Sequence, residues 1–368
     1  MLVHMMDNHT APRPRHLICL FAMLAAMASW AAGAVAQPEQ WLITALEAAK
    51  PEQPLEVAVG VQVDQVTAVD QKAENFGVVA NLRIEWTDPA LAFDAREFGR
   101  DFKLYNRADF ARFAAENAIL VPDFVIYNQQ GRRFIQDQSF TVFANGHAAY
   151  LERFTTTLQA PDFDFVQYPF DSQRFFIHIE STWPSGYVHF LPMQEYSGLG
   201  KQLGEEEWVF NQTRTKISTI KGVTGKPSSR FTLGFVGHRH LNYYILRIFI
   251  PLGIIILVSW VTFFLHDFGK RVDVGGGNLL VLVAFNFTIS DNLPQLGYMT
   301  FLDAILVVTF VLTGLVVVVN VMYRRLEVSG RETLARQIDK YTIWVYPASL
   351  GMLVLLCWHL YESFPASG

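Results

Sequence analysis

Four apolar runs in the last third of the chain constrain its fold more than any other feature of the sequence. They cover residues 243–265, 274–289, 299–323 and 341–361. Three of these runs are long enough to cross the ~30 Å hydrocarbon core of a bilayer as helices. The second run is shorter and contains glycines and asparagines, so as a helix it should face water or protein rather than lipid. We therefore predict a transmembrane domain of four helices over residues 241–368, with the second helix at about 272–290.

The stretch before these runs has the pattern of a soluble β-structure. Apolar residues occupy every second position in several short segments, and clusters of Gly, Pro and Asp separate these segments. Such alternation is typical of half-buried antiparallel strands. The clearest segments are 57–63, 81–86, 175–180 and 208–217. The pattern predicts a β-sandwich domain over residues 37–240.

The first 36 residues have the features of a secretory signal peptide. Arg13 and Arg15 precede an apolar run, and the small residues at 34–36 form a cleavage pattern. The alternative is a membrane anchor, but the run is shorter than the ~20 residues that span a bilayer. Cleavage removes Cys19 and leaves Cys357 near the C-terminus, so the exported β-domain cannot contain a disulfide.

The basic residues between the apolar runs predict the direction of each helix. Lys270 and Arg271 lie between the first two runs, and further Lys and Arg residues lie within 324–340. The loop 290–298 contains neither residue type. Because positive loops favour the cytoplasmic side, we expect both basic loops inside the cell and the β-domain outside.

Several classes of function are not supported by the sequence. The net charge is −5 and no basic stripe is visible, which argues against a nucleic-acid partner. The sequence has no Gly-rich phosphate loop, no HExxH motif, no Cys/His metal spacing and no nucleophile elbow. We therefore predict that the chain is not an enzyme, and we expect no catalytic residue, no metal site and no cofactor.

Five motifs, in the same order along the chain, resemble those of the pentameric ligand-gated ion channels, the Cys-loop receptor family. They are WTDP at 86–89, VPD with YN at 121–128, YPFDSQ at 168–173, the R, YY, P and SW positions of 239–260, and NLP with Y at 292–298. These segments resemble, in turn, a strand end, the first ligand loop, the FPFDxQ loop, the first membrane helix with its entry, and the loop after the pore helix. The resemblance covers nearly the whole chain that follows the signal peptide.

The departures from the family pattern resemble its bacterial branch. In animal members two cysteines bracket the FPFDxQ loop, whereas this chain has Pro161 and Phe175 at the corresponding positions. The inner loop 324–340 is also short. The resemblance implies a homopentamer in the bacterial inner membrane, in which each chain joins four further copies around a central pore. It implies periplasmic β-domains, with agonist sites between neighbouring copies.

One face of the second predicted helix is acidic at both ends and apolar in the middle. Its members follow one another at steps of three or four residues, as one helical face requires. They are Asp273, Gly277, Leu280, Ala284, Phe287 and Asp291. In a pentamer the acids form rings that attract cations, and the apolar residues form constrictions that close by dewetting. Each glycine of 275–277 costs a helix about 1 kcal/mol, which suggests that this segment widens or softens the inner third of the pore.

The charge pattern predicts a channel for monovalent cations. Lys270 and Arg271 favour the alternative of an anion channel, although anchoring at the cytoplasmic side also accounts for them. A second alternative is a non-conducting sensor, in which a periplasmic β-domain is held by a four-helix anchor. A transporter is less well supported, because inverted repeats are not visible.

The resemblance assigns ligand contacts to four residues. Tyr127 belongs to the first ligand loop, Trp183 to the second, and Phe231 is the nearest aromatic residue of the third. Asn81 occupies the position at which the neighbouring subunit often offers an aromatic residue. Aromatic walls bind ammonium groups by cation–π attraction, but the same aromatic residues are also compatible with a sandwich core. The expected agonist is a small molecule such as an amine, or a proton.

The resemblance also assigns the coupling between the two domains. Asp171 of the 168–173 loop and Arg239 should meet at the membrane face of the β-domain, as an ion pair that is destabilised when either partner is removed. Pro169 and Phe170 lie in the same loop, and Pro294 is expected beneath it.

Overall fold

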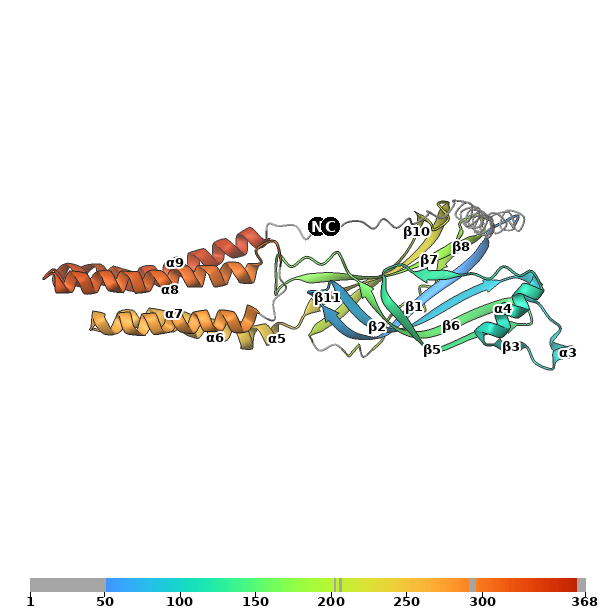
Figure 1. Cartoon of the computed structure of the whole chain (residues 1–368), viewed down its shortest axis with the longest axis horizontal. Coiled ribbons are helices and arrows are strands. Elements are labelled where there is room, and N and C mark those ends of the chain that lie inside the picture. Colours follow the sequence, from blue (N-terminus) through green and yellow to red (C-terminus); the bar gives the residue numbers. More distant parts are fainter. Residues whose placement is uncertain (1–50, 202, 205–206, 291–295, 363–368) are drawn as a thin grey trace, which may run out of the picture. The chain divides into compact units, whose positions relative to one another are not determined.

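The computed structural model describes residues 51–201, 203–204, 207–290 and 296–362. The predicted signal peptide at 1–36, Asp291 and Pro294 lie outside the described residues. Strands dominate the described chain up to Arg239, and helices dominate from Leu241 onward (Figure 1). This is the combination of a β-sandwich with four long apolar helices that the sequence predicted.

Two sheets form the β-domain. The larger one has the strand order β3-β5-β6-β2-β1-β8, with β9 also pairing with β1. Its strands are β1 (Leu55–Asp70), β2 (Asn75–Thr87), β3 (Phe102–Tyr105), β5 (Gln129–Phe143), β6 (His147–Gln159), β8 (Val188–Pro192) and β9 (Gly198–Leu199). The smaller sheet has the order β10-β11-β7-β4. Its strands are β4 (Phe124–Ile126), β7 (Ser172–Pro184), β10 (Trp208–Lys221) and β11 (Pro227–Arg239).

Alternating side chains bury one face of each sheet. On β2, Leu82, Ile84 and Trp86 are almost fully buried while the residues between them are partly exposed. Phe76 of the larger sheet contacts Phe175 of the smaller one edge to face, with ring centroids 5.0 Å apart. The two buried faces therefore pack against each other, as in a β-sandwich. Two short helices, α3 (Ala95–Phe98) and α4 (Arg107–Glu116), lie between β2 and β4 in the sequence.

Four helical segments are long and apolar enough to cross a membrane. The first consists of α5 (Leu241–Tyr244), a π-helical turn (Ile245–Phe249), α6 (Ile250–Val261) and a 3-10 turn (Thr262–Phe264). The π-helical turn ends two residues before Pro251, which has no N–H to donate to the preceding turn of the helix. The other three are α7 (Phe268–Ser290), α8 (Phe301–Val328) and α9 (Glu332–Glu362).

Helices α8 and α9 extend well beyond the predicted spans 299–323 and 341–361. Only residues 329–331 separate them, so most of the predicted inner loop 324–340 is helical. Ion pairs one turn apart stabilise these polar ends: Arg324 pairs with Glu327 and Arg336 with Glu332, both at 2.7 Å. Hydropathy locates the segment that fits the hydrocarbon core, whereas a helix ends where capping and turn residues end it.

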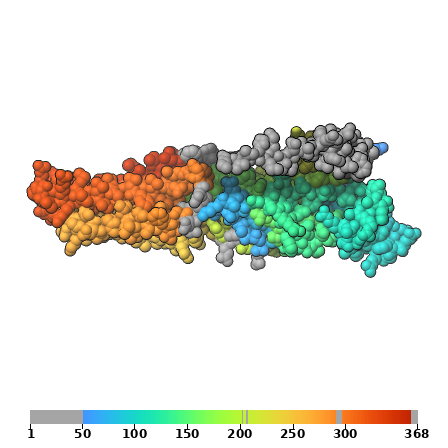
Figure 2. All heavy atoms as spheres, viewed as in Figure 1, coloured from blue at the N-terminus to red at the C-terminus, as the bar shows by residue number. Residues whose placement is uncertain are grey.

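The helices of a single chain leave much apolar surface uncovered. Side chains such as Leu280, Val311 and Leu355 are 70%, 63% and 69% exposed, and α8 and α9 contribute the orange and red surface in Figure 2. Lipid or further copies of the chain must cover this surface, because exposed apolar area on this scale is unfavourable in water.

Candidate functional site

Helix α7 presents the predicted pore stripe on its exposed face. All described members of the stripe are exposed in the single chain: Asp273, Gly277, Leu280, Ala284 and Phe287. Leu280 and Phe287 are large apolar side chains with 70% and 69% of their area exposed. The remaining member, Asp291, lies outside the described residues.

The opposite face of α7 packs against the rest of its own bundle. Its buried residues include Arg271, Gly275, Asn278 and Leu282, again at steps of three or four. Each lies two residues before a member of the exposed stripe, which is about 200° around an α-helix. The stripe is therefore the side of α7 that has no partner among the described residues of its own chain.

The polar residues of α7 are divided between these two faces. Asn278 is 7% exposed and donates hydrogen bonds to the Ile255 carbonyl and to Ser259 Oγ, both at 2.8 Å. Gly275 lies close to α8, since a Cβ at this position would approach Val317 to 3.3 Å, whereas Gly277 has open space around it. The sequence predicted that this helix faces water or protein rather than lipid. The side chain of Asn278 forms its hydrogen bonds with protein groups. Gly275 allows close packing of α7 against α8, a role that the hypothesis of a softened pore did not include.

Arg271 is held inside the bundle at the start of α7. Its guanidinium forms two hydrogen bonds to Asp339 of α9, at 2.6 and 2.9 Å, and a third to the Leu265 carbonyl at 2.6 Å. The side chains of Arg271 and Asp339 are 4% and 13% exposed. Phe268 lies 4.8 Å from the guanidinium. In contrast, the neighbouring Lys270 is exposed.

Arg239 and Asp171 meet, as their motifs led us to expect. Arg239 Nε and Nη2 donate to the two carboxylate oxygens of Asp171 at 2.8 and 3.2 Å, and both side chains are almost fully buried. Arg239 Nη1 also donates to Glu207 at 3.0 Å and to the Tyr244 hydroxyl at 3.1 Å. Although burial lowers the pKa of Arg239, the adjacent Asp171 carboxylate raises it, so the guanidinium stays charged.

Sequence reasoning missed three partners of Arg239. They are Glu207, Tyr244 and Trp208, whose ring lies 4.3 Å from the guanidinium. The ring of Tyr168 lies 4.6 Å from it, and burial raises the pKa of this tyrosine to about 12. Glu207 and Trp208 are separated from Arg239 by the whole β10–β11 hairpin, and only the pairing of Trp208 with Arg239 brings them together.

The loop that carries Asp171 contacts the outer ends of α8 and α9. The Phe301 and Leu302 N–H groups donate to the Val166 and Tyr168 carbonyls at 2.9 and 3.2 Å. A capping box between Thr300 and Asp303 fixes the start of α8 beneath this loop.

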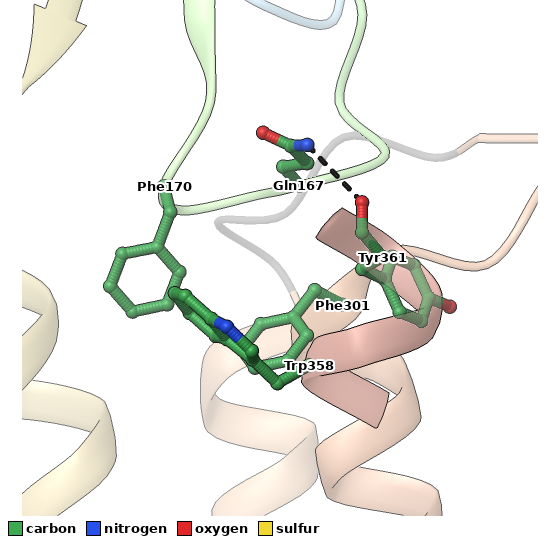
Figure 3. Close-up of a pocket in the computed structure, with 5 residues that line it drawn as sticks. All are labelled: Gln167, Phe170, Phe301, Trp358 and Tyr361. Carbon is green, nitrogen blue, oxygen red and sulfur yellow. Dashed lines mark hydrogen bonds between the residues drawn. The ribbon is translucent and has the colours of Figure 1, made fainter. Parts of the chain in front are cut away.

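Phe170 of this loop belongs to an aromatic cluster between the loop and the two helices. Figure 3 shows Phe170, Phe301 and Trp358 around a cavity of about 70 Å³, with Gln167 donating to the Tyr361 carbonyl at 3.2 Å. The Trp358 ring lies 5.9 Å from both phenylalanine rings. Pro169, in a cis peptide bond, directly precedes Phe170.

Tyr127 and Trp183 lie on the smaller sheet and its adjoining loops. Tyr127 is 63% exposed, and the Arg230 guanidinium lies 4.8 Å from its ring centroid. Glu180 holds Arg230 through a hydrogen bond of 2.8 Å. Trp183 is partly buried and donates from Nε1 to the Val121 carbonyl at 3.0 Å. The cation position above the exposed tyrosine is thus filled by a side chain of the protein itself.

The structure places Phe231, the third predicted ligand contact, in the core of the β-domain and not on its surface. This residue is fully buried in the core and is paired with Ile179 and Ile217 in the smaller sheet. Its side chain has the same parity on β11 as Leu233 and Phe235, which are also buried, and this pattern was a signal for a core position.

Asn81 lies on the larger sheet, apart from Tyr127 and Trp183. It donates to Asp64 at 2.8 Å, and Arg153 contacts both of these residues. Asn81 and the strand β4 that precedes Tyr127 therefore belong to different sheets of the β-domain.

Comparison with known proteins agrees with this geometry. Residues 44–224 match the family model of the neurotransmitter-gated ion-channel ligand binding domain. A proton-gated ion channel from Gloeobacter violaceus is 26% identical over 325 residues, which cover 85% of each protein. A γ-aminobutyric acid receptor subunit rho-2 from Rattus norvegicus is 24% identical over 307 residues, covering 81% of this chain and 63% of the receptor. A glutamate-gated chloride channel from Drosophila melanogaster is 24% identical over 262 residues, covering 68% of this chain and 54% of that channel.

The chain belongs to the pentameric ligand-gated ion channel family. Members of this family are membrane channels that assemble as pentamers, and they are not enzymes. The β-domain corresponds to the extracellular ligand-binding domain, since the family match lies within the N-terminal part of the chain. The sequence resemblance to this family is therefore confirmed.

Proposed function

We propose that the protein is a homopentameric, cation-selective channel whose pore is lined by the exposed stripe of α7. The observation that carries this proposal is the division of charge on α7. Asp273 lies on the exposed face, while Arg271 is buried and neutralised by Asp339. Five copies of Asp273 around one axis form an acidic ring that attracts cations, and Leu280 and Phe287 supply the apolar constriction.

An anion channel is the second candidate. The name of one animal relative, a glutamate-gated chloride channel, favours it. The exposed Lys270 in the first turn of α7 points the same way. Against it stands the position of Asp273 on the exposed face, one turn before Gly277. An acidic ring of Asp273 side chains should repel anions.

The contacts at the ligand surface favour protons over amines as the agonist. An amine needs an open aromatic face, but Arg230 already lies over Tyr127 and is held there by Glu180. An amine must displace this guanidinium and leave Glu180, whose side chain is 6% exposed, without its partner. The relative from Gloeobacter violaceus is a proton-gated ion channel. Tyr127, Trp183 and Asn81 remain the proposed interface positions for a small-molecule agonist.

We further propose that the channel lies in the bacterial inner membrane with its β-domain in the periplasm. Lys270 lies in the first turn of α7, Arg324 and Arg325 lie near the end of α8, and Arg331 lies between α8 and α9. Basic residues at these ends of the helices favour the cytoplasmic side. The opposite ends of α8 and α9 contact the loop of the β-domain that contains Phe170.

Recording from purified protein in planar bilayers tests these proposals. We expect currents that appear when the pH on the β-domain side is lowered and that reverse near the equilibrium potential of the cation in asymmetric KCl. Reversal near the chloride potential contradicts cation selectivity, and a complete lack of current at any pH or with any small amine favours a non-conducting sensor. Asp273→Asn should reduce the cation preference, whereas the exposed Glu332→Gln at the start of α9 serves as a control of equal charge change.

A further inference from the structure

The ion pair between Arg271 and Asp339 places two opposite charges inside a bundle that is otherwise largely apolar. Asp339 belongs to α9, and only 6% of the apolar stretch of this candidate span is buried within the protein, the smallest share of the four spans. Despite this, its side chain is 13% exposed and faces the guanidinium with both oxygens. Burying a carboxylate within a membrane protein is costly unless it is paired. The anchoring of α9 in lipid therefore does not by itself explain why the side chain of Asp339 is buried.

We propose that Asp339 is a positioning residue for ion selectivity, because it holds the positive charge of Arg271 out of the ion pathway. This inference rests on the proposed cation channel. Arg271 and Asp273 are two residues apart, so their Cα atoms differ by only about 3 Å in height along the helix axis. A long arginine side chain released from the bundle can therefore reach the level at which Asp273 is exposed.

The net charge at the height of Asp273 depends on the ion pair between Arg271 and Asp339. With Arg271 bound to Asp339, the pair is neutral and Asp273 dominates the inner end of the pore. With Asp339 neutralised, every subunit adds one uncompensated guanidinium beside its Asp273 carboxylate, and the two rings largely cancel. A mouth without net negative charge no longer favours cations.

The other charged groups near the start of α7 do not replace Asp339. Asp267 accepts hydrogen bonds from the Gly269 and Lys270 N–H groups and is exposed. Glu327 pairs with Arg324 on the surface of α8. Within the described chain, the Arg271 guanidinium also contacts the neutral Leu265 carbonyl and the Phe268 ring, and Asp339 is the carboxylate that pairs with its charge.

Reversal potentials of full-length channels in asymmetric KCl test the inference. Asp339→Asn should lower the permeability ratio of potassium to chloride by about tenfold or more. The double variant Arg271→Gln with Asp339→Asn carries neither charge and should restore the wild-type ratio. Glu332→Gln removes an exposed acid from the same helix and should leave the ratio unchanged. A purely structural pair predicts altered thermal stability but the wild-type ratio in all variants.

An unchanged ratio in Asp339→Asn, with a cation-selective wild type, overturns this inference alone. An anion-selective wild type overturns the proposed function before any variant is tested. Should Asp339→Asn fail to assemble, Arg271→Cys with Asp339→Asn contains neither charge of this pair and can receive a positive charge at residue 271 from a thiol-reactive ammonium reagent. A fall in the ratio on labelling supports the inference, and an unchanged ratio after complete labelling refutes it.

Discussion

Replacement of Arg239 by alanine should abolish agonist-evoked current without removing the channel from the membrane. Arg239 makes four hydrogen bonds: two to Asp171, one to Glu207 and one to Tyr244. Its side chain is fully buried and that of Asp171 is 1% exposed. The substitution therefore leaves a buried carboxylate whose remaining side-chain partner is Gln173.

The size of the effect follows from the loss of a buried charge pair. Removing one partner of such a pair typically costs about 3–5 kcal/mol, which corresponds to about two to four orders of magnitude in an equilibrium constant. Only the part of this energy that differs between the closed and open states shifts gating. Arg239→Lys keeps the charge but cannot reach Asp171, Glu207 and Tyr244 together, so we expect an intermediate loss. Each missing charge-assisted hydrogen bond is worth about 1.5–3 kcal/mol.

Concentration–response curves and surface labelling of the same cells measure this effect. The current of Arg239→Ala should be lost while surface protein remains detectable, and Asp171→Ala should give the same result. Arg247→Ala provides a matched control, because Arg247 is an exposed arginine in the membrane segment that follows Arg239. Currents of wild-type size and sensitivity from surface-expressed Arg239→Ala would refute the coupling role of this network.

Three further predictions concern the pore, the junction and the β-domain. Leu280→Ala should give basal current because a smaller apolar ring wets more easily, whereas Leu282→Ala, on the buried face, should lower stability by about 2–5 kcal/mol without leak. Trp358→Ala should enlarge the cavity beside Phe170 and weaken the agonist response, while Trp344→Ala, which is 70% exposed on the same helix, should not. Burial and the Arg230 cation lower the pKa of His178 from 6.5 to about 4. As the pH drops from about 6.5 to 4, the unfolded chain takes up a proton that the folded chain does not, so the free energy of unfolding should fall. Part of this fall should be absent in His178→Gln, as measured by thermal unfolding against pH.

Local patterns were sufficient to predict the architecture. Strand alternation and apolar run length depend on neighbouring residues alone, and these patterns led to the β-domain and the four membrane helices. The pore stripe follows from the helical period in the same way, and the exposed face of α7 carries its described members. The alternation of apolar residues around residue 231 also indicated a core position for Phe231. The resemblance to the family instead assigned this residue to a ligand loop.

Contacts between distant segments required the tertiary structure. Arg271 and Asp339 are 68 positions apart, and so are Arg239 and Asp171. A family motif indicated the second pair, but no pattern in the sequence connected Arg271 with α9. The same holds for Arg230, which is 50 positions from Glu180 and lies over Tyr127.

The amino-acid sequence thus determined which segments are strands, which cross the membrane, and which face of the second membrane helix is available to line a pore. Only the tertiary structure decided which charged side chains stay exposed on those surfaces and which are paired and buried. The physical reason is that hydrophobic period is a property of consecutive residues, whereas the fate of a charge depends on whether a distant partner reaches it and buries it.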